Sequence, residues 1–278
     1  METRARGQAT TTERYHFVDA LRGLCITGVV LYHFLYDIYH VYGHNPQWAG
    51  QLYCRIWQEG TCFIFIAMAG FVWRLGSKSS LRRGLELNAL GLLISLITIL
   101  FIPSETIWFG ILNFMGCATL IMGASHRWAQ RVEPMLGMLT GLVTFATCRN
   151  LDNGLWGLEG FCELELPAAL YSSYALAPLG LPPASFSSSD YFPLLPWLGA
   201  YFFGYYLYAL LQARELLGGF LCWRVPLFFP PGTAQFGNLS AASARVHGHC
   251  HLIICIIDNF PAELFAKSCW FSLYFMGT

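Results

Sequence analysis

The chain of 278 residues is 55% hydrophobic, 16% aromatic and only 12% charged, and its mean hydropathy is +0.48. Because about one-quarter of a soluble globular chain is charged, this composition excludes an ordinary cytoplasmic domain, a disordered chain and a basic nucleic-acid-binding protein. Its 16 basic and 16 acidic residues cancel, so no net charge selects a polyanionic or polycationic partner. The composition therefore predicts an integral membrane protein.

Apolar segments separated by polar loops predict an all-α, polytopic membrane protein with about six transmembrane helices. Residues 1–14 are polar, and no apolar stretch with a cleavage site follows them, so we expect a cytoplasmic N-terminus rather than a cleaved signal peptide. Residues 150–190 are mixed and rich in Pro, Gly and Ser. The apolar segments run over about residues 20–42, 62–75 (with an amphipathic extension back through 48–57), 85–102, 107–124, 135–148 and 191–212.

The distribution of basic residues predicts the orientation of these segments. If the segments alternate in direction, the N-terminus and the loops after the second, fourth and last segments share one side, and they hold most of the Arg and Lys residues. The positive-inside rule makes that side cytoplasmic. We therefore expect a multi-pass protein of the inner (plasma) membrane, surrounded by membrane lipid.

Titratable residues follow one face of the first segment. Positions 22, 26, 29, 33, 37, 40 and 44 have the spacing of a helical stripe, and His33, Asp37, His40 and His44 lie on it. Because ionisable groups are costly in hydrocarbon, this face should look into the protein or into a wet cavity. At about 1.5 Å per residue, His33 would lie near the middle of the bilayer and His44 near its outer surface.

His33 and Asp37 are one helical turn apart, so the carboxylate can orient the imidazole as a general base for a hydroxyl or an amine. The alternative is a buried His–Asp pair that holds helices together. A metal or haem site on this face is a further alternative, but no second segment supplies a histidine at comparable depth. No two cysteines have CxxC spacing, which argues against a zinc or iron–sulfur site. We expect no metal.

Arginines near the cytoplasmic ends of the segments are candidates for cofactor binding. Asp19 and Arg22, three residues apart, can form a local salt bridge. Alternatively, Arg22 holds the phosphates of a cytoplasmic cofactor together with Arg82 and Arg83, because the planar guanidinium grips phosphate in two places.

Two polar side chains are expected near the outer half of the membrane. Asn113 lies in the first turns of the fourth segment, and Asp190 precedes the last one. Each position by itself is typical of helix capping. Together with His33, Asp37 and His44, they would enclose one pocket that is open to the outside.

Five motifs occur together in the chain: Glu-Arg-Tyr-His-Phe-Val-Asp-Ala-Leu-Arg-Gly (13–23), Tyr-His-Phe-Leu-Tyr-Asp (32–37), Met-Ala-Gly-Phe (68–71), Phe-Gly-Ile-Leu (109–112) and Ser-Asp-Tyr-Phe-Pro-Leu-Leu-Pro-Trp (189–197). In this combination the chain resembles the short bacterial branch of the heparan-alpha-glucosaminide N-acetyltransferase catalytic-domain family, over about residues 13–227. The resemblance implies a transmembrane acyltransferase domain over 15–227. Such a protein takes an acetyl group from cytoplasmic acetyl-CoA, its donor substrate, to a glycan acceptor on the far side, in the envelope or outside the cell.

The resemblance also bears on individual residues. The family implies a catalytic histidine beyond the first span. His44 lies closest to that position. Because the spacing around His44 differs from that of the family, His33 remains a second candidate. The bacterial branch carries a histidine where this chain has Asn113. If the reaction needs that histidine, this chain lacks it.

The last part of the chain departs from the family. The family's final span begins near Gly-Arg-His-Ser and contains Leu-His-Gln-Pro, motifs that residues 231–246 lack. Permitted codons for that stretch, read from the second base of each, can spell Leu-Gly-Arg-His-Ser-Leu-Ala-Ile-Tyr-Leu-Leu-His-Gln-Pro-Val. Our hypothesis is a one-base slip near Phe228-Phe229 that makes 230–278 an out-of-frame tail and this copy inactive. The histidine-rich residues 247–251 then carry no metal site.

Two other classes of function compete with an acyltransferase. A proton-coupled secondary transporter would use the His33 and Asp37 face as a proton relay, although the chain has no visible internal repeat. A non-catalytic membrane protein would use that face as a packed polar seam. In an acyltransferase, His33 or His44, oriented by Asp37, would deprotonate the acceptor as it attacks the thioester, or would carry the acetyl group covalently.

Overall fold

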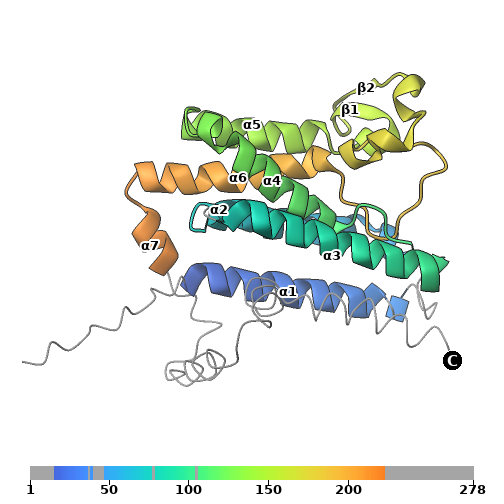
Figure 1. Ribbon diagram of the computed structural model, residues 1–278, viewed down its shortest axis with the longest axis horizontal. Helices are drawn as coiled ribbons and strands as arrows, with labels where there is room; N and C mark the ends of the chain where they lie inside the picture. Colours follow the sequence, from blue (N-terminus) through green and yellow to red (C-terminus); the bar gives the residue numbers. More distant parts are fainter. Residues whose placement is uncertain (1–15, 37, 40–46, 77–78, 104–105, 223–278) are drawn as a thin grey trace, which may run out of the picture. The chain divides into compact units, whose positions relative to one another are not determined.

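The computed structural model describes residues 16–36, 38–39, 47–76, 79–103 and 106–222, and most of them are helical (Figure 1). The chain divides into two compact units. Unit 1 comprises Met1–Arg55 and Leu216–Thr278, and unit 2 comprises Ile56–Glu215. The predicted fold class, a helical protein with membrane-spanning segments, is confirmed in this coarse form.

The described part of unit 1 is built around helix α1 (His16–Tyr36) and the short helix α7 (Leu217–Cys222). The rings of Phe17 and Phe220 lie 4.5 Å apart and join the two helices. Helix α1 begins four residues before the predicted start at residue 20. Its predicted continuation to residue 42 falls mostly outside the described residues, because 37 and 40–46 are not among them.

Unit 2 holds most of α2 (Leu52–Trp73) together with α3 (Ser80–Phe101), α4 (Ile111–Ala129), α5 (Pro134–Thr147) and α6 (Leu194–Ala213). Each of these helices coincides with an apolar segment predicted from the sequence. Helix α3 packs against α4 and α5 packs against α6, in both cases antiparallel, and α4 also contacts α6. These pairs are visible side by side in Figure 1.

Glycines allow the backbones of α2 and α6 to touch. A Cβ atom on Gly70 would lie 1.9 Å from the carbonyl oxygen of Tyr201, and one on Gly204 would lie 1.6 Å from that of Ala67. Small residues at such contacts are typical of membrane helices, which associate through close packing because lipid is as apolar as their side chains. Beside this contact, Tyr201 and Tyr205 are fully buried.

Four helices are long and apolar enough to cross a membrane: Phe17–Tyr36, Leu52–Trp73, Ser80–Phe101 and Leu194–Ala213. On α3, Leu85, Leu92 and Leu96 are more than half exposed, as expected for side chains that face lipid. Helix α5, with 14 residues, reaches only about 21 Å at about 1.5 Å per residue. The predicted count of six spans and the cytoplasmic N-terminus stay predictions.

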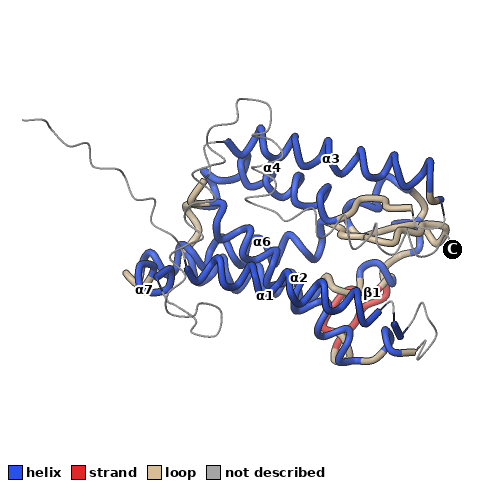
Figure 2. Tube along the Cα trace, turned by 90° about the horizontal axis from the view of Figure 1, so that it is seen from below, coloured by secondary structure: helices blue, strands red, loops and turns tan. Residues whose placement is uncertain are grey.

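Residues between α5 and α6 form structure that the sequence analysis did not anticipate. Strands β1 (Leu155–Leu158) and β2 (Cys162–Glu165) pair as an antiparallel hairpin, drawn in red in Figure 2. Gly160 takes a positive φ of 73° in its turn, where glycine has no steric penalty. Short 3-10 helices flank the hairpin at Leu151–Asn153, Ala168–Tyr171 and Tyr174–Leu179.

Candidate functional site

Two of the sequence motifs lie side by side in unit 2. The backbone N–H of Ser189 donates to the carbonyl of Thr106 at 3.1 Å, and the N–H of Phe192 donates to the carbonyl of Phe109 at 3.1 Å. These bonds align the segment before α6 with the segment before α4. They hold Asp190, which lies between the two donors, at the beginning of α4.

Asp190 reaches the N-terminus of α4 because residue 110 is a glycine. The N–H of Ile111 donates to Oδ2 of Asp190 at 3.2 Å. A Cβ atom on Gly110 would lie 2.8 Å from that same oxygen, so a larger residue would push the carboxyl group away. Burial raises the pKa of Asp190 to about 6, against the opposite effect of the hydrogen bond from Ile111. The Phe-Gly-Ile-Leu and Ser-Asp-Tyr-Phe-Pro motifs therefore form one structural feature.

A cavity of about 300 Å³ adjoins Asp190. Its wall comes from the first half of α2, the end of α5, the loop after it, the segment before α6 and the start of α6. Carboxylates, an arginine and a tryptophan ring line the same space. The lining residues are Gln58, Glu59, Cys62, Phe145, Cys148, Arg149, Asp152, Ser189, Asp190, Tyr191, Phe192, Pro193, Leu195, Pro196 and Trp197.

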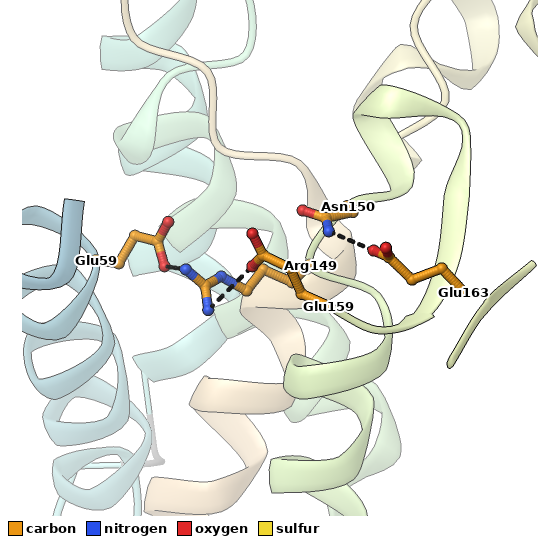
Figure 3. A network of polar contacts seen from close by, with 5 residues as sticks. All are labelled: Glu59, Arg149, Asn150, Glu159 and Glu163. Atoms are coloured by element: carbon orange, nitrogen blue, oxygen red, sulfur yellow. Dashed lines mark hydrogen bonds and ion pairs between the residues drawn. The ribbon is translucent and has the colours of Figure 1, made fainter. Parts of the chain in front are cut away.

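Charged side chains at the edge of this cavity are connected to one another (Figure 3). Arg149 forms an ion pair with Glu59 of α2 and lies 3.5 Å from Oε2 of Glu159 in the turn of the hairpin. Nδ2 of Asn150 donates to Oε1 of Glu163 on β2 at 2.7 Å. The network thus ties the hairpin to the helices that form the cavity wall.

Sequence reasoning did not select Glu59, Arg149 or Trp197 as site residues. The sequence could have indicated Glu59, because a carboxylate within an apolar segment of membrane-spanning length is costly and commonly marks a functional site. Arg149 had no such signal, since its partners Glu59 and Glu159 come from other elements. Trp197 had one, because it ends the Ser-Asp-Tyr-Phe-Pro-Leu-Leu-Pro-Trp motif.

Asn113 does not line the cavity. It is buried in α4, and its Oδ1 points at α3, where a Cβ atom on Gly91 would lie 2.2 Å away. Asp190 and Asn113 are therefore both near the start of α4 but face different surroundings. The predicted role of Asn113 in substrate binding stays a prediction.

Two of the three arginines proposed for cofactor binding, Arg82 and Arg83, contact protein groups nearby. Nε of Arg82 lies 2.6 Å from Oε1 of Glu86, one turn further along α3. The guanidinium of Arg83 donates to the carbonyl of Gly76. Arg22 is half-buried in α1, in the other unit. Their predicted joint role in holding phosphates is not tested by these contacts.

The histidines of the predicted stripe belong to unit 1. His33 is half-buried in α1, with its ring centroid 6.0 Å from that of Tyr32 in an edge-on arrangement. Asp37 and His44 lie outside the described residues. Because His33 belongs to a different unit from Asp190, their common pocket stays a prediction. Within the described residues, no group of three or more His, Cys, Asp and Glu side chains is placed to hold a metal ion.

Comparison with known proteins supplies an independent finding. A family model described as "Heparan-alpha-glucosaminide N-acetyltransferase, catalytic" matches residues 14–234. The matched range includes α1 to α6, the hairpin and the whole of the cavity described above. No curated protein and no solved structure matches the chain.

Proposed function

The chain belongs to the heparan-alpha-glucosaminide N-acetyltransferase catalytic family, and from this membership we propose that it moves an acetyl group from cytoplasmic acetyl-CoA to a sugar amine or hydroxyl on the opposite side of the inner membrane. The match over residues 14–234 carries the proposal. The four helices that are long and apolar enough to span a membrane support it, because transfer between two compartments needs a membrane domain.

We assign the acceptor to the cavity beside Asp190. Its volume of about 300 Å³ is at the lower end for small-molecule sites, which suits one or two sugar rings. The indole ring of Trp197 offers an apolar face to the C–H groups of a sugar, and the carboxylates of Glu59 and Asp190 accept hydrogen bonds from hydroxyl or ammonium groups. Asn113 stays a candidate for contact with the acceptor, although its side chain faces α3 and does not line this cavity.

In the proposed reaction, a histidine acts as general base. His33 or His44, oriented by Asp37, removes a proton from the acceptor amine or hydroxyl as that atom attacks the thioester carbonyl. The new C–N or C–O bond forms, the C–S bond breaks, and the proton passes to the leaving thiolate of coenzyme A. A positioned base of this kind contributes about 100- to 10,000-fold to the rate.

Arg22, Arg82 and Arg83 are proposed to hold the phosphates of acetyl-CoA on the cytoplasmic side. For Arg82 this requires leaving Glu86, and its side chain is 73% exposed. An exposed pair one helical turn apart contributes only about 0.3–0.5 kcal/mol. Phosphate therefore competes easily with Glu86 for this guanidinium.

The histidines give the sharpest test of the proposal. Membranes that contain the chain are incubated with labelled acetyl-CoA, and acetylated glycan is measured. We expect transfer by the chain whose reading frame is restored after Phe229, and its loss when the catalytic histidine is removed from that chain, by His33→Ala or by His44→Ala. His126→Ala is the matched control, because His126 hydrogen-bonds to Tyr205 and Gln130 in unit 2 and has no role in the proposed chemistry.

Transfer that survives in both histidine variants would exclude these residues as the base. The assay also includes the present chain, in which the reading frame after Phe229 is not restored. If only the restored copy is active, the missing last span explains the inactivity of the present chain. If neither copy transfers acetyl groups, the proposed function is wrong.

A further inference from the structure

The hairpin between α5 and α6 presents its apolar side chains outward. Trp156 and Leu158 are each 45% exposed, Leu164 is 57% exposed and Phe161, in the turn, is 88% exposed. Trp156 pairs directly with Leu164 across the strands, and residues two apart in a strand share a face, so Leu158 lies on that side as well. We call Trp156, Leu158, Phe161 and Leu164 the apolar hairpin face.

Two of the three carboxylates of the hairpin contact the rest of unit 2, and the third, Glu165, is exposed. Glu159 lies 3.5 Å from the guanidinium of Arg149, and Glu163 accepts a hydrogen bond from Asn150 at 2.7 Å (Figure 3). A hairpin bathed in water shows the opposite arrangement, with apolar residues inside and carboxylates outside. The outward position of the four apolar side chains indicates that this face meets an apolar medium.

The position of the hairpin along the helix pair identifies that medium. Helices α5 and α6 run antiparallel, and the ring of Phe145, near the end of α5, lies 5.3 Å from that of Trp197, near the start of α6. The hairpin follows at this end of the pair (Figure 1). Because α6 is long and apolar enough to span a membrane, its first residues mark the level of one membrane surface.

The surface of α5 connects this level with the membrane interior. Leu136, Leu139 and Val143 follow one another along the outward side of α5 and are each exposed. In a membrane-embedded helix pair, such side chains face the acyl chains. The apolar hairpin face follows beyond the end of α5, and its Trp156 belongs to a residue type that gathers at the membrane–water interface.

We propose that the apolar hairpin face inserts into the boundary between headgroups and acyl chains of the outer leaflet, as a monotopic anchor beside the cavity. Residues 155–165 hold three glutamates and no lysine or arginine, so attraction to anionic lipid contributes nothing. Insertion therefore depends on burial of apolar area in any phospholipid. Through Glu159 and Arg149, the inserted hairpin holds the edge of the cavity at the membrane surface.

Photo-crosslinking in the full-length chain tests this proposal. Phe161, Leu164 and Asn153 are replaced one at a time by p-benzoylphenylalanine, and the protein is reconstituted in phosphatidylcholine vesicles, irradiated and analysed by mass spectrometry. We expect a phosphatidylcholine adduct at positions 161 and 164. Asn153 is the matched control, because it is exposed and lies in the same loop region but outside the apolar hairpin face, and it should give no lipid adduct.

A fourth variant at Leu96, on the exposed side of the candidate span α3, reports whether the protein is inserted in the bilayer. A lipid adduct at Leu96 with none at positions 161 and 164 would overturn the proposal. So would a covalent dimer formed from either hairpin position, because the face would then contact a second copy. Neither result depends on acetyl transfer, so the outcome is separate from that of the proposed function.

Discussion

Asp190 is held in place by a neighbour that has no side chain. The carboxyl group caps α4 through Ile111 only because residue 110 leaves the space free. Helix N-termini favour negative charge, whereas burial disfavours it, and the pKa of about 6 shows that burial dominates here. The residue is therefore poised to change its charge close to neutral pH.

Gly110→Ala should displace Asp190. The new methyl group would lie 2.8 Å from Oδ2 of Asp190 and 2.9 Å from a methyl carbon of Ile107. We expect a loss of stability of about 1–3 kcal/mol, as for other overpacked sites, and a fall in acetyl transfer. Thermal unfolding in detergent measures the first effect and the labelled assay the second.

Gly60→Ala is the matched control for this change. Gly60 also belongs to unit 2, but a Cβ atom there meets nothing within 4 Å, so the substitution should be neutral or slightly stabilising in helix α2. Equal unfolding temperatures for the two alanine variants would contradict the account of Gly110.

The raised pKa of Asp190 predicts how stability depends on pH. Between an unfolded pKa near 4 and the folded value of about 6, the folded protein holds a proton that the unfolded chain has released. The contribution of Asp190 to stability is therefore greatest at low pH and is lost as the pH rises through about 6. Asp190→Asn cannot titrate and should remove this part of the pH dependence.

Thermal unfolding of the parent and of Asp190→Asn across this pH range measures the effect. The difference in unfolding temperature between the two proteins should shift in favour of the variant as the pH increases. A difference that is constant with pH would show that the folded pKa of Asp190 is not raised.

At the level of elements, long apolar segments were predictable and short ones were not. The prediction of a helix over 135–148 is confirmed by α5 (Pro134–Thr147). This helix was predictable because its apolar segment is uninterrupted and begins at a proline, which favours the first position of a helix. The hairpin was missed because its strands have four residues each and because Leu158 and Leu164 face outward. Strand prediction from alternating residues expects the apolar side chains to be buried, and in this hairpin they are exposed.

The ion pair of Arg149 with Glu59 beside the cavity could not be predicted from sequence patterns either. Helical spacing relates residues three or four positions apart. Glu59 and Arg149 belong to α2 and to the end of α5, and only the packing of these helices makes them partners. Asp190 was predicted near the start of the last apolar segment, but its place at the N-terminus of α4 was not, because its hydrogen bond with Ile111 joins residues 79 positions apart.

The contact between α2 and α6 predicts a large effect of a small substitution. Gly204→Ala would place a methyl group 1.6 Å from the carbonyl oxygen of Ala67, so the two helices must separate. We expect a loss of at least about 1–3 kcal/mol, measured as a lower unfolding temperature in detergent. Gly218→Ala in α7 meets open space and is the control. A variant at 204 as stable as the one at 218 would refute this helix contact.

At the scale of the whole molecule, the proposed reaction needs both units. The acceptor cavity lies in unit 2, while the histidine stripe and Arg22 belong to unit 1. The family match crosses both units and ends at residue 234, shortly after Phe229. The frame slip near Phe228-Phe229 stays a hypothesis, and functional tests therefore compare the frame-restored copy with the present chain.

The most direct test of the central claim is acetyl transfer across a membrane. Inverted inner-membrane vesicles with the frame-restored chain receive labelled acetyl-CoA on their exposed cytoplasmic face, and vesicles without the chain are the control. The account predicts labelled acetyl groups on glycan enclosed within the vesicles, and their absence when Asp190 is replaced by Asn in the acceptor cavity. Label that remains in acetyl-CoA or free acetate, in vesicles shown to contain the inserted protein, would contradict it.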